Sequence, residues 1–265
     1  MVKNLIPEND LLNPEEIKKG LKTKIIGKKV YFFNKISSTN LYAKNLIKKN
    51  IEEGTIVIAD VQTRGMGRKN RYWHSPYGGL WFSVILYPDL SPKRGIFITM
   101  AASISVVQAI KDINGVDTEI KWPNDLLLRK KKVCGILTEI DADLHKINYA
   151  IVGIGINVNN KLDDELKKIA FSLKQEIGSE VSRLKILKSI LENLDKNYNK
   201  LINKDLDYIK KAWFYFSKII GRKIQITDGN IVRKGVVKQI DDNGGLILQT
   251  EFGEIRITSG DIKYL

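Results

Sequence analysis

The segment 55–87 reads TIVIADVQTRGMGRKNRYWHSPYGGLWFSVILY and places a basic loop between two apolar runs. TIVIAD is short and rich in β-branched residues, which is typical of a buried strand. Residues 79–87 alternate and are rich in aromatic and β-branched residues, so they also predict a strand. The loop 61–76 carries four cationic residues before Trp73, two glycines and no acidic residue. This composition makes it a candidate anion-binding loop, with a solvated turn as the alternative.

Size and composition limit the class of protein. A chain of 265 residues with 43% apolar residues can bury a large core, as one domain or as a large and a small domain. The first sixteen residues do not resemble a signal peptide, and no apolar run approaches the roughly 20 residues of a membrane helix. The single cysteine, Cys134, cannot form a disulfide within the chain, and no His/Cys cluster indicates zinc. These features predict a cytoplasmic protein that does not interact with membranes.

The net charge of +14 suggests an anionic partner. Lysines are scattered through nearly every segment, however, so a compositional bias can explain most of this charge. A nucleic-acid-binding face would require clustered charge, and only 64–71 and 129–132 are dense in cations. A nucleic-acid-binding module is therefore the alternative reading from a different functional class.

Apolar periodicity and turn residues divide the chain into elements. Asn13 and Pro14 predict the start of a short helix, and Pro92 predicts the start of a long apolar helix. From Ser217 onward, short β runs are separated by DG, NGG and FG turns, which predicts a small antiparallel barrel or sandwich. The fold class is α+β, with domains expected at 1–216 and 217–265. We expect helices at 14–20, 41–49, 92–112 and 179–216, and further strands at 29–34, 118–121, 125–128, 133–140 and 147–157.

Two more stretches contain residues suited to a binding site. In KWPND, Pro123 makes a rigid corner that can aim Asn124 and Asp125 into a cleft, although such a corner can be a plain turn. Lys132 is the last residue of the RKKK turn at 129–132 and begins the returning strand, although lysines in a hairpin turn are usually just solvated. In IVGIGINVNN, 151–160, glycines within an apolar strand suggest close approach of a ligand.

Five motifs together resemble the biotin–protein ligases, also called biotin–[acetyl-CoA-carboxylase] ligases. They are SSTN at 37–40, QTRGMGRKNRYW at 62–73, KWPND at 121–125, KVCG at 132–135 and GIGINVN at 153–159. The resemblance implies a mixed-sheet catalytic domain followed by an SH3-like β barrel. It also implies a ligase-only member, because only about a dozen residues precede PEEIKKGL. We therefore expect no N-terminal DNA-binding domain and no specific binding to DNA.

The resemblance implies a two-step reaction. The biotin carboxylate attacks the α-phosphate of ATP to give biotinyl-5′-AMP, and a lysine of a biotin carboxyl carrier domain then takes the biotin. Mg²⁺ is expected to accompany ATP. Family members often dimerise through the catalytic sheet, so a homodimer is one expected state. The nearest rival is a lipoate–protein ligase, which shares the fold and chemistry but typically has an RRxSGGG-type loop.

The resemblance also assigns roles to residues of this chain. Catalysis is expected of Arg68, Lys132 and Asp125. Many members have an arginine where this chain has Met66, so Arg64 or Arg68 must supply that charge. The expected biotin-binding residues are Ser38, Thr39, Asn40, Gln62, Gly65, Met66, Gly67, Arg68, Trp73, Lys132, Gly135 and Gly153. The expected nucleotide-binding residues are Arg68, Arg71, Trp73, Asn124, Lys132 and Asn157, and no protein metal site is expected.

Overall fold

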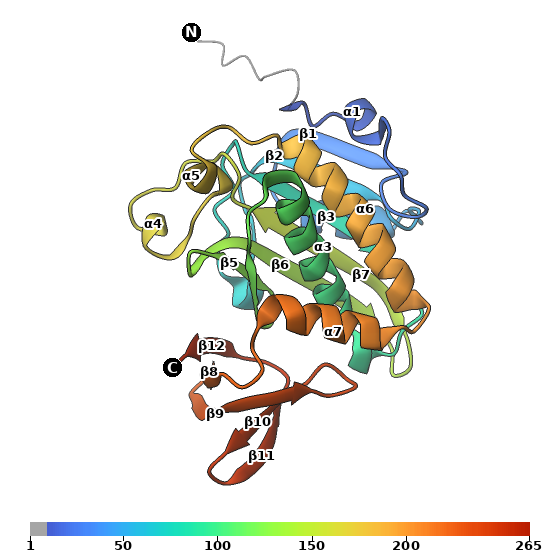
Figure 1. Cartoon of the computed structure of the whole chain (residues 1–265). Helices are drawn as coiled ribbons and strands as arrows, with labels where there is room; N and C mark the ends of the chain where they lie inside the picture. Colours follow the sequence, from blue (N-terminus) through green and yellow to red (C-terminus); the bar gives the residue numbers. More distant parts are fainter. Residues whose placement is uncertain (1–9) are drawn as a thin grey trace.

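The computed structural model describes residues 10–265 and contains two β-sheets (Figure 1). Residues 1–9, which belong to the predicted 1–216 domain and to the segment judged not to be a signal peptide, lie outside the described residues. The helices are α1 Pro14–Lys18, α2 Thr39–Ile47, α3 Ile96–Asn114, α4 Leu166–Ile169, α5 Leu173–Ile177, α6 Arg183–Ile202 and α7 Leu206–Ser217. The strands are β1 Val30–Ile36, β2 Ile56–Gln62, β3 Leu80–Leu86, β4 Glu119–Lys121, β5 Asp125–Leu128, β6 Lys131–Ala142, β7 Ile147–Ile156, β8 Lys223–Asp228, β9 Ile231–Ile240, β10 Leu246–Thr250, β11 Gly253–Ile257 and β12 Asp261–Tyr264.

The larger sheet is mixed, which confirms the predicted fold class. Its strand order is β1-β2-β3-β7-β6-β5-β4. Only the β1–β2 pair is parallel, and α2 makes the crossover between these two strands. The edge strands of this sheet are β1 and β4.

The two faces of this sheet differ because side chains alternate along each strand. On one face, Val57, Ile85 and Ile151 pack against Ala43 and Leu46 of α2. Helix α2 covers only part of this face. On β7, the next positions on the same face are Gly153 and Gly155, which carry no side chain. The missing side chains leave that part of the face hollow.

The opposite face is covered by α3 and α6, which lie side by side (Figure 1). Segment Pro92–Asn114 is long and apolar enough to cross a membrane, with a mean hydropathy of 1.5, so the expectation that no segment reaches this range was wrong. Within the fold, 72% of its apolar window is buried. The sheet and the helices α6 and α7 surround α3, which accounts for apolar residues on every side of this helix.

The predicted elements are present with ends that differ by up to about four residues, and the helical segment expected at 179–216 is divided into α6 and α7. Asn13 caps α1 by accepting a hydrogen bond from the backbone N–H of Glu16 at 2.8 Å, as predicted. The β5–β6 hairpin turns at Arg129 and Lys130, whose φ angles are 53° and 63°, so β6 begins two residues earlier than predicted. Helices α4 and α5 and strand β12 were not predicted, because each is too short to show a clear period.

The C-terminal strands form a separate antiparallel sheet with the order β11-β10-β9-β8-β12. It corresponds to the small β module that the DG, NGG and FG turns predict. An ion pair joins this module to the larger domain in addition to the covalent chain. Arg222 Nη1 lies 2.7 Å from Glu119 Oε1 on β4. Burial, with Glu119 nearby, raises the pKa of Tyr264 to about 12.

A buried charge cluster joins the start of α6 to the sheet. Arg183 is 1% exposed, and its guanidinium donates to Asp10 at 2.7 Å and to Asp60 at 2.8 Å. Asp60 lies on β2, shortly before the basic loop. Burial raises the pKa of Asp60 in spite of the opposing charge of Arg183. The cluster therefore fixes Asp10 to the strand that leads into the loop.

Candidate active site

Three glycines form the floor of a cavity on the open face of the larger sheet. Gly135 of β6 lies opposite Gly155 of β7, and Gly153 lies one step further along β7. An added Cβ at Gly153 would come within 2.2 Å of the Asn40 amide oxygen, and one at Gly155 within 2.4 Å of the Trp73 ring nitrogen. These positions require glycine because other side chains already occupy the space above them.

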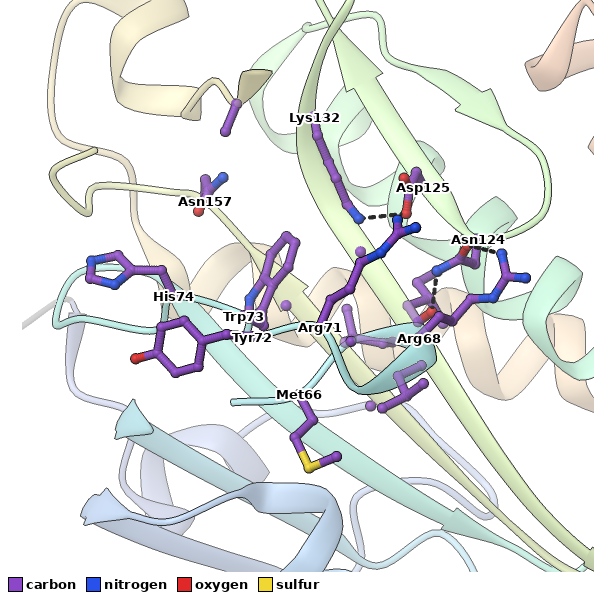
Figure 2. A pocket seen from close by; sticks show the side chains of 18 of the residues that line it. Met66, Arg68, Arg71, Tyr72, Trp73, His74, Asn124, Asp125, Lys132 and Asn157 are labelled. Atoms are coloured by element: carbon purple, nitrogen blue, oxygen red, sulfur yellow. Dashed lines mark hydrogen bonds and ion pairs between the residues drawn. The ribbon is translucent and has the colours of Figure 1, made fainter. Parts of the chain in front are cut away.

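The cavity has a volume of about 550 Å³, which is in the range of small-molecule sites. Residues far apart in sequence line it, from α2, the basic loop, β5, β6 and β7. Figure 2 labels lining residues from the basic loop, from β5 and β6, and from the positions next to β5 and β7. The following predicted site residues line it: Ser38, Thr39, Asn40, Gln62, Met66, Gly67, Arg68, Arg71, Trp73, Asn124, Asp125, Lys132, Gly135, Gly153 and Asn157.

One wall of the cavity is a buried polar network at the start of α2. Ser38 is the N-cap of this helix, and its side chain accepts a hydrogen bond from the Leu41 backbone N–H. Gln62 accepts from the Thr39 backbone N–H at 2.9 Å, while its own amide donates to Ser75 at 3.0 Å. Such a wall offers donors and acceptors to a small polar group.

The basic loop crosses the cavity and is attached to the sheet by Arg68. Arg68 Nη1 donates to Asn124 Oδ1 at 3.1 Å, and Asn124 Nδ2 in turn donates to the carbonyl of Ile136 at 2.8 Å (Figure 2). Asn124 follows Pro123, whose peptide bond with Trp122 is cis. The predicted corner therefore presents the Asn124 amide to the loop.

The C-terminal module holds the other part of the basic loop. Arg71 Nη2 lies 2.5 Å from Asp261 Oδ2, and Lys69 Nζ lies 3.7 Å from both Asp228 and Asp261. Burial opposes ionisation of Asp261, but the hydrogen bond and charge of Arg71, with Lys69 nearby, hold the pKa of this carboxyl below its ordinary value. Asp261 also lines the cavity, which the sequence did not predict.

Lys132 enters the cavity from β6. Its Nζ lies 2.7 Å from Asp125 Oδ1 and 5.0 Å from the centre of the Trp73 ring (Figure 2). Lys131 points elsewhere and donates to the Lys167 carbonyl at 2.6 Å. Lys130 lies in the turn, as predicted, but it also lines the cavity, which was not predicted. The lysine and the carboxylate form one paired unit, not two independent charges.

A β-bulge explains why Lys132 and Gly135 share the open face. Leu126 pairs with Cys134 and Leu127 with Lys132, so one extra residue, Val133, lies between these pairs. Without the bulge, strict alternation would place Lys132 on the face opposite Gly135. The bulge therefore turns the lysine toward the cavity.

Gly65 is the predicted site residue that does not line the cavity. It is buried, and an added Cβ would lie 2.4 Å from the Trp73 carbonyl and 2.5 Å from the Ser75 hydroxyl. Its role is thus to let the two ends of the loop approach each other. Arg64, the alternative to Arg68, is exposed and lies outside the lining.

Several lining residues were missed from the sequence. Segment 162–170 contributes Leu162, Leu166 and Ile169, and Ala170 forms a bridge with Lys132. Their apolar pattern gives no sign that a segment so far along the chain returns to β6. Ser83 lies beneath the cavity and contacts both Thr39 and Asn40. A serine in an otherwise apolar strand was the available signal for it.

Comparison with known proteins matches two stretches of the chain to family models. Residues 32–157 match the Biotin/lipoate A/B protein ligase family, and residues 219–263 match the Biotin protein ligase C terminal domain. The chain is 40% identical over 263 residues to the bifunctional ligase/repressor BirA of Bacillus subtilis, covering 98% of this chain and 81% of that protein. It is 27% identical over 233 residues to the biotin–[acetyl-CoA-carboxylase] ligase of Paracoccus denitrificans, covering 86% of this chain and 97% of the relative.

Solved structures agree with the sequence comparison. The biotin protein ligase from Aquifex aeolicus in complex with biotin and ATP superposes with a TM-score of 0.76 at 29% identity, covering 90% of this chain and 99% of that chain. The likeness extends over the catalytic sheet and the C-terminal module together. The chain therefore belongs to the Biotin/lipoate A/B protein ligase family, and within it to the biotin protein ligases.

Proposed function

We propose that this chain activates biotin with ATP as biotinyl-5′-AMP and transfers it to a lysine of a biotin carboxyl carrier domain. The observation that carries this proposal is the cavity, which joins a neutral polar wall to a group of cations. Ser38, Thr39 and Gln62 suit the ureido ring of biotin, whereas Arg68 and Lys132 suit a carboxylate next to a phosphate.

The first step brings two anions together. The biotin carboxylate oxygen attacks the α-phosphorus, the bond to the bridging oxygen breaks, and pyrophosphate leaves. Fixed cations lower the barrier because they neutralise the charge that develops on the transferring group. Arg68 is already oriented by Asn124, and Lys132 by Asp125, so little reorganisation is needed when ATP binds.

The second step needs an uncharged amine at the mixed anhydride. Asp125 has one oxygen directed at Lys132, and we propose that its other oxygen receives a proton from the incoming lysine of the carrier domain. The amine then attacks the biotinyl carbonyl, and AMP leaves. Arg71 and Asn157 are proposed to contact the nucleotide, and Trp73 to cover the biotin tail or the adenine.

Mg²⁺ is proposed to arrive with ATP and to neutralise charge on its phosphates. Within residues 10–265, no group of three or more His, Cys, Asp or Glu side chains could hold a metal ion. Two lining carboxylates, Asp125 and Asp261, are each paired with a cation. This arrangement fits Mg²⁺ that is bound mainly by substrate phosphates and water.

The test of the proposed function is transfer of biotin to a purified biotin carboxyl carrier domain. Incorporation should require ATP and Mg²⁺, and mass spectrometry should locate it on one lysine. Lipoate in a parallel reaction distinguishes the nearest rival. Preferential use of lipoate, or no acid-dependent release of pyrophosphate, would contradict the proposal.

Replacing Arg68 with glycine should loosen retention of biotinyl-AMP more than it slows its formation. Arg68 spans the cavity to Asn124, so its loss removes both a cation and the attachment of the loop to the sheet. Losing a charged hydrogen bond of this kind corresponds to about a tenfold to 100-fold faster release. Rapid gel filtration of enzyme that carries labelled biotinyl-AMP measures the release rate.

Arg64→Gly is the matched control, because it removes the same charge from the same loop outside the cavity. Bystander lysines on an unrelated protein should be labelled by Arg68→Gly and not by Arg64→Gly. Equal retention by wild type and Arg68→Gly would show that Arg68 does not hold the intermediate.

A further inference from the structure

We propose that Lys121 binds the pyrophosphate part of ATP, at the end of the cavity where the sheet finishes in strand β4. Lys121 belongs to the KWPND stretch and lines the cavity, although the sequence gave roles only to Asn124 and Asp125 in that stretch. The inference rests on the proposed function, because it concerns the leaving group of the first step.

A row of paired residues runs across the sheet beneath the cavity. Gly155 of β7 pairs with Gly135 of β6. Gly135 pairs with Asp125 of β5, and Asp125 in turn pairs with Lys121 of β4. Residues directly opposite each other on neighbouring strands have their side chains on the same face of a sheet. Lys121 therefore shares the open face with the glycine floor and follows Asp125 toward the β4 edge.

The two ends of the proposed biotin site give the direction of biotin along this row. The ureido end belongs at the polar wall, where Thr39 accepts a hydrogen bond from Ser83 of β3 at 2.7 Å. The carboxylate end belongs near Lys132, whose Nζ lies 2.7 Å from Asp125 Oδ1. Biotin thus crosses the strands from β3 over β7 to β6, with its reacting carboxylate toward β5.

The geometry of the displacement then fixes where pyrophosphate lies. The biotin carboxylate oxygen attacks the α-phosphorus, and the bond from that phosphorus to the bridging oxygen of pyrophosphate breaks. The attacking and leaving oxygens lie roughly in line, on opposite sides of the phosphorus. Because biotin approaches from the β6 side, pyrophosphate lies beyond the α-phosphate, on the β4 side. Lys121 is the residue of the row at that end, and it carries a positive charge.

The charge of Lys121 is available to a ligand. Its neighbour in the row, Asp125, already holds Lys132. Within residues 10–265, no carboxylate forms an ion pair with Lys121. The other lining carboxylate, Asp261, is paired with Arg71. The Lys121 ammonium can therefore give its donors to phosphate oxygens without first breaking an ion pair.

The C-terminal module lies along the same part of β4. Glu119 is two residues before Lys121 on this strand, so the two side chains share a face. The Glu119 carboxylate accepts a hydrogen bond from Arg222 of the module at 2.7 Å, so its charge is opposed as well. Pyrophosphate bound by Lys121 is thus placed near the boundary between the two domains.

Lys130 provides a matched comparison for Lys121. It also lines the cavity and, in the part of the chain that the structure describes, forms no ion pair. It lies in the β5–β6 turn, however, and is not a member of the row. The two lysines carry the same charge, so a difference between their variants must come from their positions.

The test starts from enzyme that carries labelled biotinyl-AMP, to which pyrophosphate and Mg²⁺ are added. A pyrophosphate oxygen then attacks the α-phosphorus, the bond to the biotin carboxylate oxygen breaks, and ATP and biotin form. Lys121→Met, which keeps an unbranched side chain without the charge, should raise the pyrophosphate concentration for half-maximal rate by about tenfold to 100-fold. Lys121→Arg and Lys130→Met should shift it by less than about threefold.

Two further measurements exclude a general defect of the site. Transfer of biotin from the same bound biotinyl-AMP to a carrier domain requires no pyrophosphate. Lys121→Met should therefore lower the rate of pyrophosphate attack relative to that of transfer by about tenfold or more at low pyrophosphate concentration. In the wild type, pyrophosphate should protect Lys121 and not Lys130 from chemical acetylation, measured by mass spectrometry. This last experiment tests the site even if Lys121→Met does not fold.

The outcomes separate the inference from the proposed function. A normal response of Lys121→Met to pyrophosphate, or a larger shift in Lys130→Met, would overturn the inference and leave the proposed function standing. Equal slowing of pyrophosphate attack and transfer would also overturn it, because Lys121 would then act on biotinyl-AMP itself. If the wild type forms no biotinyl-AMP from biotin and ATP, the proposed function fails instead.

Discussion

Lys132→Ala is expected to slow biotin- and ATP-dependent pyrophosphate release by about 10²–10³-fold at saturating biotin. The Lys132 ammonium is held by Asp125 at 2.7 Å above the glycine floor, at the end of the cavity where we place the carboxylate and the α-phosphate. Without it, two anions face each other in a partly enclosed site. The Asp125 carboxylate, left without its cation, adds a third negative charge. The expected loss is therefore larger than that of an exposed ion pair.

The neighbouring lysines are the controls for this prediction. Lys131→Ala should stay within a few-fold of wild type, because Lys131 binds the Lys167 carbonyl away from the cavity. Lys130→Ala should also have a small effect, since Lys130 lies in the turn and at the rim. Measuring pyrophosphate release by all three single variants tests which lysine the first step requires. A severe loss in Lys131→Ala with normal Lys132→Ala would mean that the strand register is wrong by one residue.

Arg183→Met should lower the free energy of unfolding by about 3–5 kcal/mol at neutral pH. The substitution keeps the length of the side chain but leaves Asp10 and Asp60 buried beside each other without a cation. Lys185→Ala, two residues along the same helix and exposed, is the matched control and should change stability by less than about 0.5 kcal/mol. Denaturant unfolding of both variants measures the difference. A change under about 1 kcal/mol in Arg183→Met would contradict the prediction.

The loss in Arg183→Met should depend on pH in a definite direction. Burial already raises the pKa of Asp60 in the folded protein, and removal of Arg183 takes away the charge that opposes this shift. A carboxyl group whose pKa is higher when folded binds more protons in the folded state, so stability falls as pH rises through that range. The deficit relative to wild type should therefore shrink from pH 7 toward pH 5. Asp10→Asn and Asp60→Asn combined with Arg183→Met should recover much of the loss at pH 7.

Much of the fold follows from local patterns in the sequence. The residues 79–87 predict a strand, and the glycines at 153 and 155 predict close approach of a ligand. The structure has strand β3 at Leu80–Leu86 and places both glycines in the lining of the cavity. The basic loop 61–76 is recognisable because glycines and arginines occur together without acidic residues. Once the strand order is known, the proximity of residues on adjacent strands of the sheet can also be predicted.

The rest depends on contacts that have no local signature. The bulge at Val133 depends on how β5 pairs with β6, and no residue type in this stretch predicts it. Asp261 reaches the basic loop across 190 residues of sequence, and Glu139 reaches Asn40 across 99. Both look like ordinary solvated carboxylates in the sequence. Their roles arise only when two separate elements pack against each other.

The contact between Arg71 and Asp261 ties ligand binding to the cohesion of the two domains. If a phosphate oxygen takes the N–H of Arg71 that now binds Asp261, it displaces this carboxylate, and the exposed pair contributes at most about 1 kcal/mol. The two effects are then reciprocal. The ligand weakens the attachment of the C-terminal module by the same factor by which that attachment weakens binding of the ligand. Salt weakens both interactions of Arg71, the one with the phosphate and the one with Asp261. With Asp261 displaced in this way, the enzyme that carries biotinyl-AMP would meet its carrier domain with the smaller domain less firmly held than before activation.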